Sequence, residues 1–169
     1  LLPILAALLL TACASAPAST TTPAPTETPA STAATLTLEQ KVGQLFIVRP
    51  DALDLTLSQE TIDDPRADGV TQVTDAMRET LQQYPVGGIC QFGKNIESPS
   101  QLAHFNKDLQ AASATPLFIT ADEEGGMVAR LANNDAFDLP RYASAAAVGA
   151  SGDPENARAM GQTIGGYLK

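Results

Sequence analysis

One stretch of the sequence decides the fold: Pro116-Leu117-Phe118-Ile119-Thr120-Ala121-Asp122-Glu123-Glu124-Gly125-Gly126-Met127-Val128-Ala129-Arg130. Its first part is apolar on both alternating faces and begins after a proline, which predicts a buried parallel strand over 117–121. The apolar run stops at three consecutive carboxylates. In α/β folds, ligands bind in the crevice beyond the carboxyl ends of the strands. Asp122, the first acid after the strand, is therefore the first candidate site residue.

Two other apolar runs, at 44–49 and 86–92, precede this strand and are predicted to be strands as well. Helical patterns separate the runs, and capping signals mark three helix starts, at Thr37, Ser98 and Asp153. A further helix is predicted over 70–84, whereas 51–69 is polar and is predicted to be a long loop.

The order is strand, helix, strand, helix, strand, helix, with no hairpin signal between strands. This alternation predicts a parallel α/β fold with three β/α units. An open doubly wound sheet and a closed (β/α)₈ barrel begin in the same way, so periodicity leaves both possible. No G-x-G-x-x-G sequence follows a predicted strand, which counts against a dinucleotide-binding fold.

The acidic end of the third strand allows several interpretations. Asp122 and Glu123 should point in opposite directions, since side chains alternate along an extended chain. Gly125 and Gly126 permit a turn that other residues resist, and one turn would return Arg130 to the crevice, where it could pair with a carboxylate or meet a sugar hydroxyl. The alternatives are a solvated acidic loop that caps the next helix, and a Mg²⁺ site, for which adjacent carboxylates alone make a poor cage.

The composition narrows the class of partner. The chain has 19 Asp and Glu against 10 Lys and Arg, a net charge of −9. Nucleic acid binding requires clustered positive charge, so no nucleic acid partner is expected. An acidic surface is compatible with neutral ligands such as sugars.

The first 34 residues are predicted to be a secretory signal followed by a tether. Residues 1–10 are almost wholly apolar but too few to span a bilayer, which fits the hydrophobic region of a secretory signal, here incomplete at its amino end. Leu10-Thr11-Ala12-Cys13 resembles a bacterial lipobox, in which the cysteine receives the lipid; an ordinary signal peptide is the alternative. Residues 14–34 are Ala, Ser, Thr and Pro with one charge, typical of a disordered tether. The expected protein is an extracytoplasmic, membrane-anchored bacterial lipoprotein with a folded domain over 35–169.

The acidic stretch also carries a family resemblance. Asp122-Glu123-Glu124-Gly125-Gly126-x-Val128-x-Arg130 resembles the signature of family 3 glycoside hydrolases, in the β-N-acetylhexosaminidase branch. Segments 38–46, 87–96 and 164–169 resemble that family in the same order. The resemblance covers 36–169 and implies the N-terminal part of a (β/α)₈ TIM-type barrel. About three of the eight units of such a barrel would be present, so the domain is expected to be truncated at its carboxyl end.

The resemblance implies roles for particular residues. Asp122 matches the aspartate that holds hydroxyls of the sugar in the −1 subsite, and Arg130 matches a substrate-contacting arginine. Glu124, Gly125 and Gly126 match structural positions. Glu123 stands where glutamine is also common, so it receives no direct role.

The catalytic residues of the branch are expected beyond Lys169. They are an aspartate nucleophile on a later strand and a histidine acid/base after a Lys-His motif, and no Lys-His pair occurs in this chain. His104, the only histidine, is expected to be a surface or rim residue. The resemblance implies neither a cofactor nor a metal.

Two functions follow from these observations. The first is a retaining β-N-acetylhexosaminidase acting on amino-sugar glycans or cell-wall fragments, of which the present chain is an inactive fragment. The second is an extracytoplasmic lipoprotein that binds a sugar or other solute without catalysis. The predicted secretory signal and tether are compatible with both functions.

Overall fold

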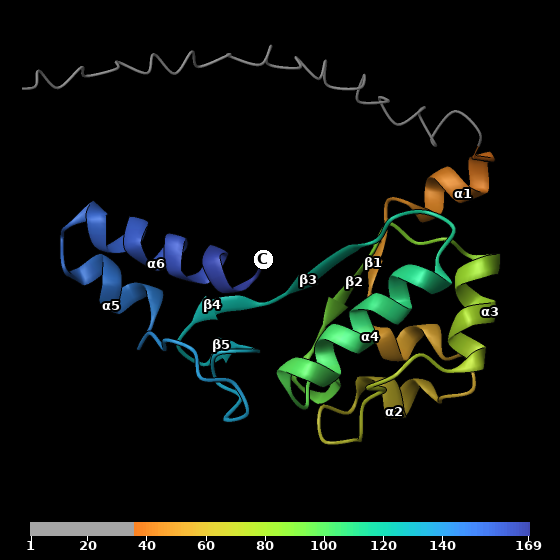
Figure 1. The fold of residues 1–169 in the computed structure, drawn as a ribbon, viewed down its shortest axis with the longest axis horizontal. Helices are drawn as coiled ribbons and strands as arrows, with labels where there is room; N and C mark the ends of the chain where they lie inside the picture. The colour runs from red at the N-terminus through yellow and green to blue at the C-terminus, as the bar shows by residue number, and fades with distance from the viewer. Residues whose placement is uncertain (1–35) are drawn as a thin grey trace, which may run out of the picture. The chain divides into compact units, whose positions relative to one another are not determined.

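The computed structural model describes residues 36–169, and Figure 1 shows their course. The predicted signal (1–13, with Cys13) and tether (14–34) lie outside the described residues. Three strands form a parallel sheet in the order β1-β2-β3, which confirms the α/β alternation. The strands are β1 (Ile47–Val48), β2 (Gly88–Gln91) and β3 (Phe118–Ala121).

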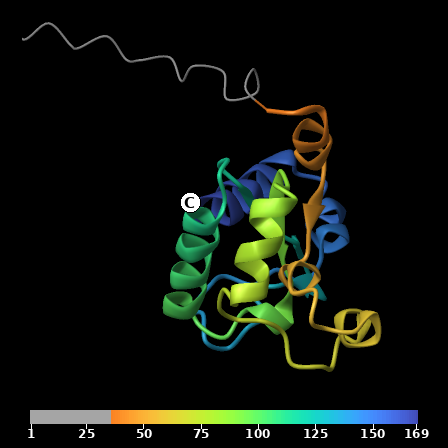
Figure 2. The ribbon, with the colours of Figure 1, turned by 90° about the vertical axis from the view of Figure 1, so that its right-hand side faces the viewer.

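Two helices, α3 (Asp75–Gln83) and α4 (Pro99–Ala112), cover one face of this sheet and lie side by side against it (Figure 2). Ile89, on the central strand, is completely buried at their centre. Burying a side chain of this size contributes about 1.5–3 kcal/mol. The main core also includes Leu53, Met77, Leu81, Val86, Phe105, Leu109 and Leu117.

The opposite face of the sheet is not covered by the described residues. Phe118 on β3 is 73% exposed, and Ile47 on β1, which pairs with the same residue of β2 (Gly88), is 52% exposed. The prediction of a fully buried third strand is therefore wrong for this face, although the strand is parallel as predicted. The reason is that side chains alternate along a strand, and helices pack against only one of the two sides in this part of the chain.

The predicted loop over 51–69 contains structure. A short 3₁₀-helix, η2 (Pro50–Leu53), is followed by α2 (Gln59–Asp63), which Ser58 caps and whose Ile62 is buried. The next helix begins later than predicted, because Thr74 accepts a hydrogen bond from the N–H of Met77 and so forms the N-cap of α3.

The three predicted helix starts agree with the structure. Thr37 and Gln40 form a complete capping box, and Ser98 and Asp153 each cap the helix that follows. No helix within 36–169 has both the length and the hydropathy needed to cross a bilayer. The remaining elements are α1 (Leu38–Gly43), η3 (Gly93–Asn95), β4 (Glu123–Gly125), β5 (Val128–Ala129), α5 (Ala145–Ala150) and α6 (Pro154–Tyr167).

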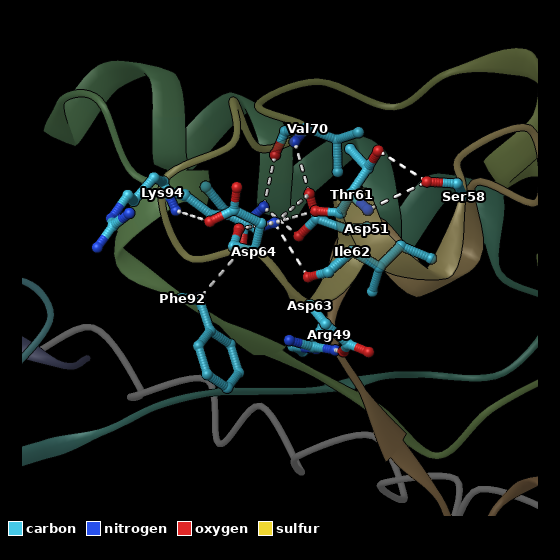
Figure 3. A network of polar contacts seen from close by, with 12 residues as sticks. Arg49, Asp51, Ser58, Thr61, Ile62, Asp63, Asp64, Val70, Phe92 and Lys94 are labelled. Carbon is cyan, nitrogen blue, oxygen red and sulfur yellow. Dashed lines mark hydrogen bonds and ion pairs between the residues drawn. The ribbon is translucent and has the colours of Figure 1, made fainter.

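A buried polar network joins the carboxyl ends of β1 and β2 (Figure 3). The side-chain amide of Asn95 donates to Asp51 Oδ2 at 2.9 Å and to the carbonyl of Val70 at 3.0 Å, and its oxygen accepts from the N–H of Phe92 at 3.1 Å. Lys94 Nζ lies 3.6 Å from Asp51 Oδ1 and donates to carbonyls at the end of α2. The network thus holds the loop that contains α2 against the sheet.

We expect Asn95→Ala to lower the free energy of unfolding by about 2–3 kcal/mol, because it leaves a buried carboxylate oxygen and a buried carbonyl without their donor. Urea unfolding followed by circular dichroism measures the change. Asn156→Ala is the matched control, since Asn156 is exposed and its side chain bonds only to Ser151 Oγ among the described residues, and it should stay within about 0.5 kcal/mol of the wild type. Equal effects of the two substitutions would contradict the role given to Asn95.

Candidate functional site

The candidate site is built on a turn that follows β3. The chain runs from β3 directly into β4, turns, and returns as the antiparallel strand β5. This hairpin lies beyond the three predicted strands, at the glycine turn that the sequence allows before Arg130. Its physical cause is the pair Gly125 and Gly126, whose φ angles of +78° and +69° lie in the left-handed region that side chains disfavour.

The turn brings Arg130 back to Asp122. The backbone N–H of Arg130 donates to the carbonyl of Asp122 at 3.0 Å, and its Nη2 lies 3.3 Å from Asp122 Oδ2. The two side chains are 30% and 43% exposed. An ion pair exposed to this degree contributes only about 0–1 kcal/mol to stability. Both groups are therefore available to a ligand without loss of the fold.

Two residues without a predicted role lie beside this pair. The Cζ atom of Arg130 is 5.3 Å from the centroid of the Phe92 ring, and the Cζ atom of Arg49 is 5.6 Å from it. Arg49 follows β1 directly and Phe92 follows β2 directly. Both residues end a predicted strand, 44–49 and 86–92, so their place at the carboxyl ends of parallel strands was visible in the sequence although neither is an acid.

Glu123 points away from Asp122 and holds the hairpin to α6. One carboxylate oxygen accepts from the N–H of Leu131, and the other accepts from Tyr167 Oη at 2.7 Å. Burial, followed by the hydrogen bond to Glu123, raises the pKa of Tyr167 above its usual value, so the hydroxyl that donates to Glu123 keeps its proton even in alkaline solution. Figure 1 shows α6 beside β4, and a Cβ atom on Gly125 would come within 2.7 Å of Met160 Cε.

The other predicted residues are placed apart from this pair. Glu124 is exposed on β4 and its side chain makes no hydrogen bond or ion pair with any residue in 36–169, so its structural role stays a prediction. His104 is exposed on α4, where its Nδ1 lies 2.7 Å from the carbonyl of Ser100, which agrees with a surface position. No three His, Cys, Asp or Glu side chains within the described range are arranged to hold a metal ion.

A cavity of about 920 Å³ lies along β3 but does not include Asp122 or Arg130. It is open and largely apolar, and its lining includes Leu102, Phe137 and the end of α6 at Tyr167. Because neither charged residue reaches it, the candidate site is the partly exposed pair at the strand's carboxyl end rather than this cavity.

Comparison with known proteins gives one family. The profile described as the glycosyl hydrolase family 3 N terminal domain matches residues 37–168. A β-hexosaminidase of Thiobacillus denitrificans is 35% identical over 99 residues, which cover 58% of this chain and 27% of that protein. A β-hexosaminidase of Bordetella avium is 36% identical over 69 residues, covering 41% of this chain and 20% of the relative.

A solved structure of a family 3 enzyme is also similar to this chain. The glycoside hydrolase family 3 β-N-acetylglucosaminidase from Paenibacillus sp. str. FPU-7 superimposes with a TM-score of 0.57 and 34% sequence identity. The match covers 77% of this chain and 21% of that one. The chain therefore spans about a fifth to a quarter of the length of the proteins it resembles.

We expect Glu123→Ala to lower the free energy of unfolding by about 1–2 kcal/mol, because the N–H of Leu131 and the hydroxyl of Tyr167 both lose their acceptor. Glu123→Gln keeps an oxygen acceptor and should cost less than half as much. Glu124→Ala removes the neighbouring exposed carboxylate and should leave stability unchanged. Thermal and urea unfolding of the three variants measure the differences; a Glu124→Ala effect as large as that of Glu123→Ala would refute this role for Glu123.

Proposed function

The chain belongs to glycosyl hydrolase family 3, and from this premise we propose that the natural protein containing it is a retaining β-N-acetylhexosaminidase. Its substrates would be amino-sugar glycans or cell-wall fragments. The relatives named β-hexosaminidase and the β-N-acetylglucosaminidase structure support this reaction class. The observation that carries the proposal is the Asp122–Arg130 pair at the carboxyl end of β3.

The position of this pair in the fold supports the proposal. The three parallel strands and their helices are β/α units of the TIM-type barrel of this family's N-terminal domain. Active sites of such barrels are built at the carboxyl ends of the strands. Asp122 and Arg130 lie just beyond that end of β3, as do Arg49 and Phe92 beyond β1 and β2.

Asp122 and Arg130 would bind the sugar that is cleaved. A carboxylate accepts hydrogen bonds from sugar hydroxyls and a guanidinium donates to hydroxyl oxygens, and charge-assisted bonds of this kind contribute about 1.5–3 kcal/mol each. Their own pairing contributes about 0–1 kcal/mol, so exchanging it for ligand hydroxyls is favourable. Fixing the ring in this way orients the anomeric carbon toward the nucleophile, and orientation supplies a large part of the barrier reduction.

The bond-breaking groups are proposed to lie outside this sequence. A retaining glycosidase needs a nucleophile and an acid/base on either side of the scissile bond. In this branch they are an aspartate and a histidine that follows a lysine, and the single histidine, His104, follows an alanine on α4. We therefore expect the 169-residue chain to hold the sugar-binding half of the site and not to hydrolyse substrate by itself.

We also propose that Cys13 carries the lipid that anchors the protein outside the cytoplasm. The support is the apolar run at 1–10, the lipobox-like sequence ending at Cys13, and the Ala, Ser, Thr and Pro composition of 14–34. Several acyl chains, at about 0.8 kcal/mol per buried methylene, would anchor it firmly. A tether of this composition would keep the catalytic domain away from the bilayer while it acts on glycans.

Asp122→Asn is expected to lower kcat/KM about 100-fold, which corresponds to about 3 kcal/mol of lost charge-assisted hydrogen bonding. The measurement uses an aryl N-acetyl-β-glucosaminide and the longest natural protein that contains these residues. Asp108→Asn is the control, because Asp108 is exposed on α4, and it should leave the rate unchanged. Unchanged kinetics in Asp122→Asn would refute the role of that residue, and sugar binding by a wild type that hydrolyses nothing would favour the solute-binding function instead.

Replacing Cys13 by Ser is expected to abolish incorporation of a labelled fatty acid and to move the protein from the membrane fraction to the soluble fraction, since serine has no thiol to carry the lipid. Metabolic labelling in a bacterial host measures the first effect and fractionation the second. Ser15→Ala, two residues beyond the cysteine, is the control and should label normally. Labelling that persists in Cys13→Ser would rule out this anchor.

A further inference from the structure

Side chains that follow three neighbouring strands come together at the carboxyl edge of the sheet. Arg49 follows β1, Phe92 follows β2 and Asp122 follows β3. The pairing of Gln91 with Ala121 places Phe92 and Asp122 next to each other just beyond the ladder. The edge beside the candidate sugar site is therefore not formed by Asp122 and Arg130 alone.

The contacts form one continuous line across this edge. Asp63, at the end of α2, accepts from Arg49 Nη2 at 2.6 Å, and Figure 3 shows this pair close to the Phe92 ring. Arg49 and Arg130 both lie within cation–π distance of that ring, and Arg130 reaches Asp122. Positive and negative groups alternate along this line. Each of the two guanidinium groups at the Phe92 ring therefore has its own carboxylate partner.

The hydrogen bonds of Arg130 do not fix its guanidinium by themselves. Its contact with Asp122 is long, at 3.3 Å, and only partly shielded from water. Its Nε is buried and has no hydrogen-bond partner among the described residues. A guanidinium held at one nitrogen can still rotate, whereas an aromatic ring in contact with it restricts its plane. The ring contact is thus the second constraint on Arg130.

We infer that Phe92 is a positioning residue for Arg130, and that Asp63 and Arg49 support the ring from the side of α2. The ring holds the Arg130 guanidinium against Asp122 in the orientation that a sugar meets. The helix α2 would then influence sugar binding without touching the sugar. The effect on the sugar rests on the proposed function, whereas the positioning of Arg130 does not.

The test uses the longest natural protein that contains these residues, labelled with ¹⁵N-arginine. The Nε–Hε group of Arg130, assigned by the loss of its resonance in Arg130→Lys, should show a lower ¹⁵N order parameter in Phe92→Leu, because the guanidinium rotates more freely without the ring, and a wild-type order parameter in Phe92→Tyr. With an aryl N-acetyl-β-glucosaminide, Phe92→Leu should raise KM about tenfold with less than a threefold change in kcat, and Phe92→Tyr should restore KM. Phe46→Leu is the control, since Phe46 is more than half exposed before β1, and it should change neither readout.

A second variant covers the case in which Phe92→Leu does not fold. Asp63 is 57% exposed, so Asp63→Asn should fold normally, release Arg49 and lower the Nε order parameters of both arginines. An Arg130 order parameter that is unchanged in Phe92→Leu, or in Asp63→Asn if only that variant folds, overturns the inference. So does an equal rise of KM in Phe92→Leu and Phe92→Tyr. If the order parameter falls while the wild type hydrolyses no N-acetylhexosaminide, the positioning stands and the proposed function fails.

Discussion

The buried amide of Asn95 is the contact on which the carboxyl edge of the sheet depends. It donates to Asp51, which follows β1, and to the carbonyl of Val70, while its oxygen accepts from the N–H of Phe92, which follows β2. Asn95 and Asp51 are both completely buried, and buried polar groups are stable only when they are hydrogen-bonded. One side chain therefore fixes the ends of two strands and the loop between them, and with them the directions in which Arg49 and Phe92 leave the sheet.

The order of the elements follows from local patterns, which is why the sequence predicts it well. Thr37, Ser98 and Asp153 cap helices because each side chain can reach a free N–H within three residues, and no distant partner is needed. The strand bounds and the helix α2 were predicted less well. The bounds depend on which residues find a partner strand, and α2 depends on Lys94, which is more than thirty residues away and binds its last carbonyls.

The candidate site likewise combines contacts that the local sequence predicts with contacts that it does not. The return of Arg130 to Asp122 could be predicted, since both residues and the two glycines between them lie in one short stretch. The contacts of Phe92 with two arginines could not be derived from periodicity, because they require three strands to be aligned at one edge. The hydrogen bond between Glu123 and Tyr167 could not be predicted either, because the two residues are 44 positions apart. It shows that the acid next to Asp122, the proposed sugar-binding residue, can stabilise the hairpin instead.

The strengths of these contacts differ in a way that suits a binding site. Breaking the buried bonds of Asn95 costs about 1–3 kcal/mol for each group left unsatisfied. A guanidinium on an aromatic ring contributes about 0.5–2 kcal/mol, and the exposed pair of Asp122 with Arg130 about 0–1 kcal/mol. A ligand that replaces the weakest contact leaves the ring contact and the buried network unchanged. The sheet edge can thus stay rigid while Asp122 exchanges one partner for another, and the arginine beside it stays in position to meet the ligand.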